Sequence, residues 1–148
     1  MVLLLLVSSC SPFNVVVPPA SYSTETALVV LANGGYKLLD ILPVDGFEDV
    51  VFDAMVGVFR LDEEIFLLYV YKSEEDEVKE IWKKLKKKFP FTSIRISFDF
   101  PNFGKISARA HGKEFVVWRR GPWLFLAEGG RGISKFVEHV QRVYSILR

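Results

Sequence analysis

The residues best suited to binding gather in the C-terminal half of the chain. Trp and Arg are the residue types most enriched where proteins bind their partners, and Gly121-Pro122 would present such residues at a rigid turn. We predict a binding patch made of Trp118, Arg119, Arg120 and Trp123 on one hairpin, with Lys105 and Arg109 on a nearby strand. A protein, an acidic glycan or a lipid head group would suit it. In the alternative interpretation both tryptophans pack in the core and the arginines are solvated.

A glycine-rich segment, Gly129-Gly130-Arg131-Gly132, precedes a predicted helix. Backbone amides at a helix N-terminus bind anions, so Gly129, Gly130, Arg131 and Gly132 form a weak candidate anion loop. The segment lacks the lysine of a phosphate-binding P-loop and the spacing of a dinucleotide-binding turn. A flexible turn from strand to helix is the simpler interpretation.

Residues with catalytic or metal-binding potential are scattered. His111 and His139 have no second His, Cys or acid at metal-ligand spacing, and no Gly-x-Ser-x-Gly elbow is present. We expect both histidines at the surface and Asp62-Glu63-Glu64 in a solvated turn, whereas Asp53 interrupts an apolar strand. The sequence predicts no catalytic residue, metal or cofactor. An enzyme remains the alternative, with carboxylates and arginines gathered in a cleft.

The N-terminus carries a short apolar run, residues 2–7, followed by Ser8, Ser9 and the single cysteine, Cys10. Val7-Ser8-Ser9-Cys10 resembles the lipobox of prokaryotic lipoproteins. The resemblance implies export, cleavage before Cys10, lipid on Cys10 and attachment to a membrane of the cell envelope. The segment departs from that pattern because no Lys or Arg precedes the apolar run and the run is short. In the alternative, residues 2–7 form a buried strand of a cytoplasmic protein.

These features divide the 148 residues into three parts. Residues 1–9 are the export-signal-like segment, residues 10–24 are a Pro/Ser tether, and residues 25–148 form one domain, long enough to bury a core without disulfides. The segment from Phe115 to Gly121, with the strand and helix after it, is similar to small exported domains of bacteria and archaea. That similarity implies no activity. Few Asn and Gln residues and lysine-rich helix surfaces suit a thermophile.

The hydrophobic periodicity predicts an α+β domain, a mostly antiparallel sheet of six to eight strands with two helices packed on it. Alternating or apolar runs predict strands at residues 27–32, 36–42, 50–60, 65–71, 93–100, 105–111, 114–119 and 123–127. Amphipathic patterns predict helices from Ser73 to Phe89, with Ser73 as its cap, and from Gly132 to Leu147. Hairpin followed by helix occurs twice, which suggests two ββα units sharing one sheet.

Charge is distributed unevenly along the chain. Residues 1–72 hold three basic and nine acidic residues, whereas residues 89–148 hold ten basic and four acidic residues. Attraction between the halves explains this, and a basic face for a polyanion or membrane is the alternative. We therefore expect a non-enzymatic, envelope-associated lipoprotein that binds a protein or glycan. The alternatives are the small soluble enzyme and a cytosolic nucleic-acid-binding domain, which needs a continuous basic, aromatic-bearing face.

Overall fold

The computed structural model describes residues 15–147, which fold around a seven-stranded antiparallel sheet. Its strands are β1 (Lys37–Phe47), β2 (Val50–Leu61), β3 (Glu64–Lys72), β4 (Ile94–Asp99), β5 (Phe103–Ala110), β6 (Lys113–Arg120) and β7 (Trp123–Gly129). They lie in the order β1-β2-β3-β7-β6-β5-β4, and every neighbouring pair is antiparallel. The predicted α+β fold is thus confirmed.

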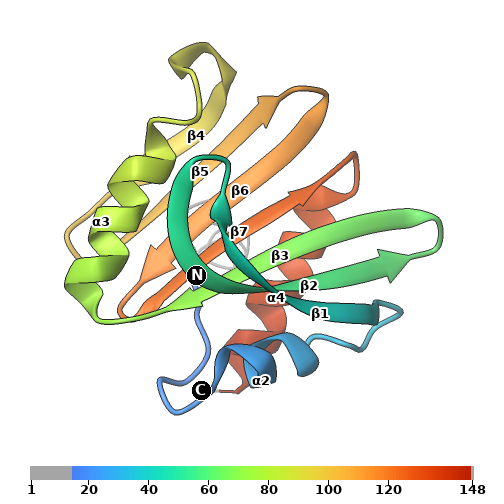
Figure 1. The fold of residues 1–148 in the computed structure, drawn as a ribbon. Coiled ribbons are helices and arrows are strands. Elements are labelled where there is room, and N and C mark those ends of the chain that lie inside the picture. Colours follow the sequence, from blue (N-terminus) through green and yellow to red (C-terminus); the bar gives the residue numbers. More distant parts are fainter. Residues whose placement is uncertain (1–14, 148) are drawn as a thin grey trace, which may run out of the picture.

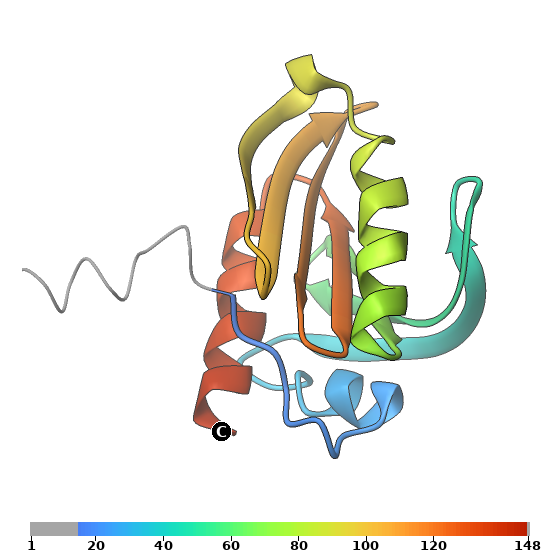
Figure 2. The ribbon, with the colours of Figure 1, turned by 90° about the vertical axis from the view of Figure 1, so that its left-hand side faces the viewer.

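The two longer helices cover opposite faces of this sheet. Figures 1 and 2 show α3 (Glu75–Lys86) on one side and α4 (Ile133–Ile146) on the other. Each helix follows a hairpin, β2–β3 or β6–β7, and the two hairpins join where β3 pairs with β7. Two predicted ββα units therefore share one sheet, and each helix buries its apolar stripe in a core cluster on its own face.

A third helix, α2 (Thr24–Val29), overlaps the strand predicted at residues 27–32, so that prediction is wrong. The Ser23 hydroxyl accepts from the Thr26 amide at 3.1 Å and caps the helix. Leu28 packs so closely on β2 that a Cβ added to Gly57 would lie 2.8 Å from Leu28 Cδ2. Tertiary packing thus overrides the β-branched composition of this segment, because a helix seals the end of the α4-side core.

The segment before α2, residues 15–22, is here called the strap. Val15, Val16 and Val17 are only 2%, 9% and 5% exposed and belong to the α4-side core. The Val16 amide donates to Gln141 Oε1 of α4 at 2.5 Å. The prediction of a tether over residues 10–24 is therefore wrong from Val15 onward, because three consecutive valines are buried in the α4-side core.

Two element boundaries also differ from the sequence prediction. Strand β1 continues through Pro43 to Phe47, with register shifts at Leu38/Asp40 and Val44/Gly46, and its hairpin with β2 bends over the α3 side (Figure 2). Helix α3 begins at Glu75 with Glu74 at the cap, while the Ser73 hydroxyl donates to Glu77 instead. No helix among residues 15–147 is long and apolar enough to cross a membrane.

Candidate functional site

The structure separates the tryptophans of the predicted binding patch from solvent. Trp118 and Trp123 are completely buried on the α4 side of the sheet, where each stacks on Phe125, at 5.0 and 5.8 Å between ring centroids. Strand alternation points both rings beneath α4 and the strap, which corrects the prediction that they form a surface patch. Within residues 15–147 neither indole N–H has a hydrogen-bond partner.

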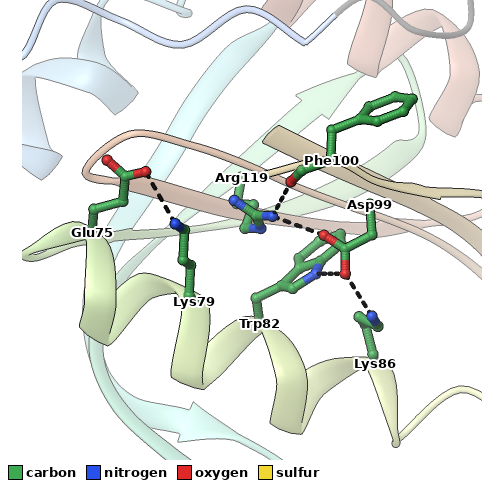
Figure 3. A network of polar contacts seen from close by, with 7 residues as sticks. All are labelled: Glu75, Lys79, Trp82, Lys86, Asp99, Phe100 and Arg119. Carbon is green, nitrogen blue, oxygen red and sulfur yellow. Dashed lines mark hydrogen bonds and ion pairs between the residues drawn. The ribbon is translucent and has the colours of Figure 1, made fainter. Parts of the chain in front are cut away.

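Arg119 points to the opposite face and is also buried, at 4% exposure. Its Nη2 donates to Asp99 Oδ1 at 2.8 Å and to the Phe100 carbonyl at 2.6 Å, and its guanidinium lies 5.5 Å from the centre of the Trp82 ring. Figure 3 shows this network between β6, the end of β4 and α3. Arg119 is therefore removed from the predicted binding patch and holds α3 to the sheet instead.

Asp99 is the centre of this network. Its Oδ2 accepts from Trp82 Nε1 at 3.1 Å and from Lys86 Nζ at 2.7 Å (Figure 3). Burial raises the pKa of Asp99, but hydrogen bonds from Lys86, Arg119 and Trp82 outweigh that effect and hold the pKa at about 2. The carboxylate is thus ionised at neutral pH, and its hydrogen bonds connect α3 to the edge of the sheet.

The other three residues of the predicted patch do share one face. Lys105, Arg109 and Arg120 alternate outward on the α4 side of β5 and β6. Arg120 Nη1 donates to the Val15 carbonyl at 3.0 Å, and its guanidinium lies 5.4 Å from the centre of the Phe103 ring. Burial lowers the pKa of Lys105, an effect that the neighbouring Glu138 opposes. These three residues thus form a basic surface beside the strap, and binding of a partner there stays a prediction.

A groove of about 430 Å³ lies between the strap and the β6–β7 turn. It is lined by Val17, Pro18, Pro19, Ala20, Arg120, Gly121, Pro122 and Trp123, and we call it the strap groove. Lys72 fixes the strap at its far end, because its Nζ donates to the carbonyls of Ala20 and Tyr22 at 2.5 and 2.7 Å. Arg120 is the one charged lining residue, so the groove suits binding of an apolar segment better than acid–base chemistry.

The candidate anion loop is already beside an acidic side chain. A Cβ added to Gly132, the residue that caps α4, would collide with the carboxylate of Glu64, the first residue of β3. A carboxylate is favourable at the positive end of a helix. Gly129, Gly130 and Arg131 complete the connection from β7 to α4. The loop predicted to bind an external anion therefore lies next to a carboxylate of the protein itself, that of Glu64.

The remaining candidates are dispersed. His139 is buried, contrary to the prediction, with Nε2 2.9 Å from the Leu31 carbonyl and its ring stacked on Tyr36 at 4.5 Å. His111 is exposed, as expected, and Asp53 also faces solvent. Among the described residues no three His, Cys, Asp or Glu side chains are placed to hold a metal. Cys10 lies outside residues 15–147.

Sequence reasoning missed the partners that the fold supplies. Asp99, Lys72 and Gln141 carry no motif and look like ordinary outward-facing residues of strands and a helix. Only the pairing of β4 with β5 and of β5 with β6 brings Asp99 to Arg119. A weak signal was available for Asp99, since it is the one acidic residue of the predicted strand 93–100 and the charged residues of the next predicted strand, Lys105 and Arg109, are basic.

Comparison with known proteins places the fold in a family. Residues 19–147 match the family model described as a protein of unknown function, DUF3242. The chain belongs to this family. A solved structure from Thermotoga maritima, described as a GTP binding regulator, shares 43% sequence identity with this chain and matches it with a TM-score of 0.82. The match covers 89% of this chain and 94% of that chain. No curated protein matches the chain.

Proposed function

We propose that this DUF3242 protein is a binding protein of the cell envelope, anchored to a membrane by lipid on Cys10. The observation that carries the proposal is the strap. The chain that follows the lipobox-like Val7-Ser8-Ser9-Cys10 is fixed to the domain from Val15 onward by burial and by the hydrogen bond to Arg120. Five residues span at most about 18 Å, so lipid on Cys10 would hold the domain directly against the membrane.

The strap groove supports binding as the domain's activity. Its walls are the apolar strap residues Val17 to Ala20 and the turn residues Gly121 and Pro122. No acidic side chain lines it, and its one charged lining residue, Arg120, pairs with no acid among the described residues. A partner segment with an apolar body and a carboxylate or carbonyl group would complement this site. The absence of converging acids from the groove favours binding over the enzyme alternative.

Cys10→Ala is expected to move the native protein from the membrane fraction to the soluble fraction. Each buried methylene of an acyl chain contributes about 0.8 kcal/mol to membrane affinity, and more than one chain gives a stable anchor. The measurement is the cell fraction of each protein together with its intact mass. Wild-type protein should begin at Cys10 and carry the mass of attached acyl chains.

Ser11→Ala serves as the matched control, because it changes the adjacent residue and leaves the cysteine. It should stay in the membrane fraction with the acylated mass. Wild-type protein that retains residues 1–9, carries no added mass and lies in the soluble fraction would overturn the anchoring proposal.

A second candidate function is regulation connected with GTP, favoured by the 43% identical relative described as a GTP binding regulator. The Gly129–Gly132 loop is the place where GTP could bind directly. A triphosphate placed there would meet the Glu64 carboxylate, and like charges repel. The Glu64 carboxylate therefore disfavours direct binding of the nucleotide at this loop and leaves contact with a GTP-binding partner protein as the other route.

Titration calorimetry with GTP and Mg²⁺ tests this distinction. We expect no saturable heat with wild-type protein at millimolar nucleotide. Glu64→Gln removes the repelling charge while keeping the side-chain shape, so it is the variant in which any latent affinity of the loop would appear. Saturable binding of GTP to wild-type protein would show that nucleotide is a direct ligand and would contradict our interpretation of the loop.

A further inference from the structure

The α4-side surface at the β4 edge of the sheet is apolar and open. Ile96 and Phe100 are 39% and 44% exposed, and Phe103 is half-buried beside them. The rings of Phe100 and Phe103 lie 5.2 Å apart, and Phe98 packs against both, at 5.7 and 5.9 Å. We call Ile96, Phe100, Phe103, Lys105 and Arg109 the β4–β5 face.

Positive charge surrounds these apolar side chains. Lys105 lies opposite Phe98 in the β4–β5 pairing, Arg109 lies farther along β5, and Arg120 lies opposite Phe103. The acids nearby are Glu138, which faces Lys105, and Glu114, which is shared by Arg95 at 3.4 Å and Arg109 at 3.6 Å. Four basic groups thus face two acidic ones, so the surface carries net positive charge.

The chain enters the domain beside this face. Arg120 contacts both the Val15 carbonyl and the Phe103 ring, so the strap begins at the edge of the aromatic cluster. Cys10 precedes Val15 by five residues, a span of at most about 18 Å. An anchor on Cys10 would therefore bring the β4–β5 face, rather than the α3 side or the β1–β2 hairpin, close to the membrane.

We propose that the β4–β5 face binds the surface of an anionic lipid bilayer. The inference rests on the proposed anchoring and deepens it, because the face would be a second membrane contact beside the lipid. Phe and Ile side chains enter the boundary between head groups and acyl chains, while Lys and Arg pair with anionic head groups. Such a contact would also fix the orientation of the domain and leave the α3 side facing away from the bilayer.

Two other partners would use the same chemistry. A second copy of the chain could pair along the exposed β4 edge, and a single-stranded nucleic acid could stack on the phenylalanines. The lipid surface is favoured because the strap delivers the chain from Cys10 to this face. The experiment separates all three.

The test uses unlipidated full-length Cys10→Ala protein, sedimented with phosphatidylcholine vesicles that contain no phosphatidylglycerol or 30% of it. We expect binding to the anionic vesicles, at least tenfold weaker binding to the neutral ones, and loss of binding at high salt. In that background Phe100→Ser and Arg109→Glu should each weaken binding at least fivefold.

Matched controls lie away from the face. Val51→Ser removes a side chain that is 76% exposed on β2, and Lys84→Glu reverses an exposed charge on α3. Both should bind anionic vesicles like the parent protein, and circular dichroism should show that all four variants are folded. Equal loss in the control variants, or no binding to anionic vesicles, would overturn the inference.

The remaining outcomes also decide the question. Self-association that Phe100→Ser abolishes, or saturable binding of an oligonucleotide, would overturn the inference if it occurs without vesicle binding. The mass of native Cys10 tests the anchor separately. If native protein carries lipid but the Cys10→Ala protein does not bind vesicles, the β4–β5 contact alone is refuted. If native protein carries no lipid but binds vesicles, the anchor alone is refuted.

Discussion

A truncation that removes residues 1–20 is expected to be less stable than one that removes residues 1–14 by roughly 4 kcal/mol, or about 10 °C in Tm. The two proteins differ by Val15, Val16 and Val17 and the three residues that follow. The valines are at most 9% exposed, and their loss uncovers the α4-side core. Their loss also leaves Gln141 and Arg120 without strap partners. Thermal unfolding followed by circular dichroism measures the difference.

Two point variants test whether the loss of stability comes from the buried valine side chains rather than from shortening the chain. Val17→Ser should destabilise the full-length protein by about 1–2 kcal/mol, because it places a hydroxyl where a buried methyl group packs. Ser21→Ala changes an exposed strap residue and should leave Tm unchanged. If the two truncations melted at the same temperature, the strap would contribute nothing to the fold and the tether predicted from the sequence would stand.

The sheet could be predicted because its signal is local. Residues 93–100 alternate apolar and polar side chains, and the hairpin at Gly121-Pro122 has turn residues between two apolar runs. Helix α3 likewise carries its amphipathic stripe and its charge gradient within one segment. The strap and α2 could not be predicted in this way. Both depend on surfaces contributed by distant residues, such as Gly57 beneath Leu28 and Gln141 opposite Val16.

The candidate site was half predictable for the same reason. Residue type drew attention to the β5–β6 region but did not say which face each side chain takes. Alternation alone separates Arg119 from Trp118 and Arg120, and register then decides that Arg119 meets Asp99. Whether a tryptophan lies at a surface depends on what covers the strand. Here α4 and the strap cover Trp118 and Trp123. The composition of the strap predicted a linker, so the sequence did not indicate that these residues cover the tryptophans.

Asp99→Ala is expected to lower the free energy of unfolding by about 3 kcal/mol, whereas Arg119→Met should lower it by only about 1 kcal/mol. The asymmetry follows from burial. Removing Asp99 leaves the Arg119 side chain, which is 5% exposed, without a counter-charge. Removing Arg119 leaves the Asp99 side chain, which is 36% exposed, with water, Lys86 and Trp82. Chemical denaturation at pH 7 measures both values.

The pair also predicts a pH dependence. The folded-state pKa of Asp99 is about 2, below its ordinary value of 3.8, so its ionised form stabilises the fold above pH 3.8, and this contribution is lost as pH falls through 2. Because the carboxylate is partly exposed, screening reduces the contribution to about 1 kcal/mol. Asp99→Asn should lose less stability than wild type between pH 5 and pH 2.

The control for this network is Glu75→Ala, which removes a carboxylate from an exposed pair with Lys79 on the same helix, 3.5 Å apart. That pair should contribute no more than about 0.5 kcal/mol. The double variant Asp99→Ala/Arg119→Met should be less destabilised than the sum of its parts, because each side chain matters chiefly through the other. Strict additivity, or an Arg119→Met cost above that of Asp99→Ala, would show that Arg119 stabilises α3 by packing on Trp82 rather than through Asp99.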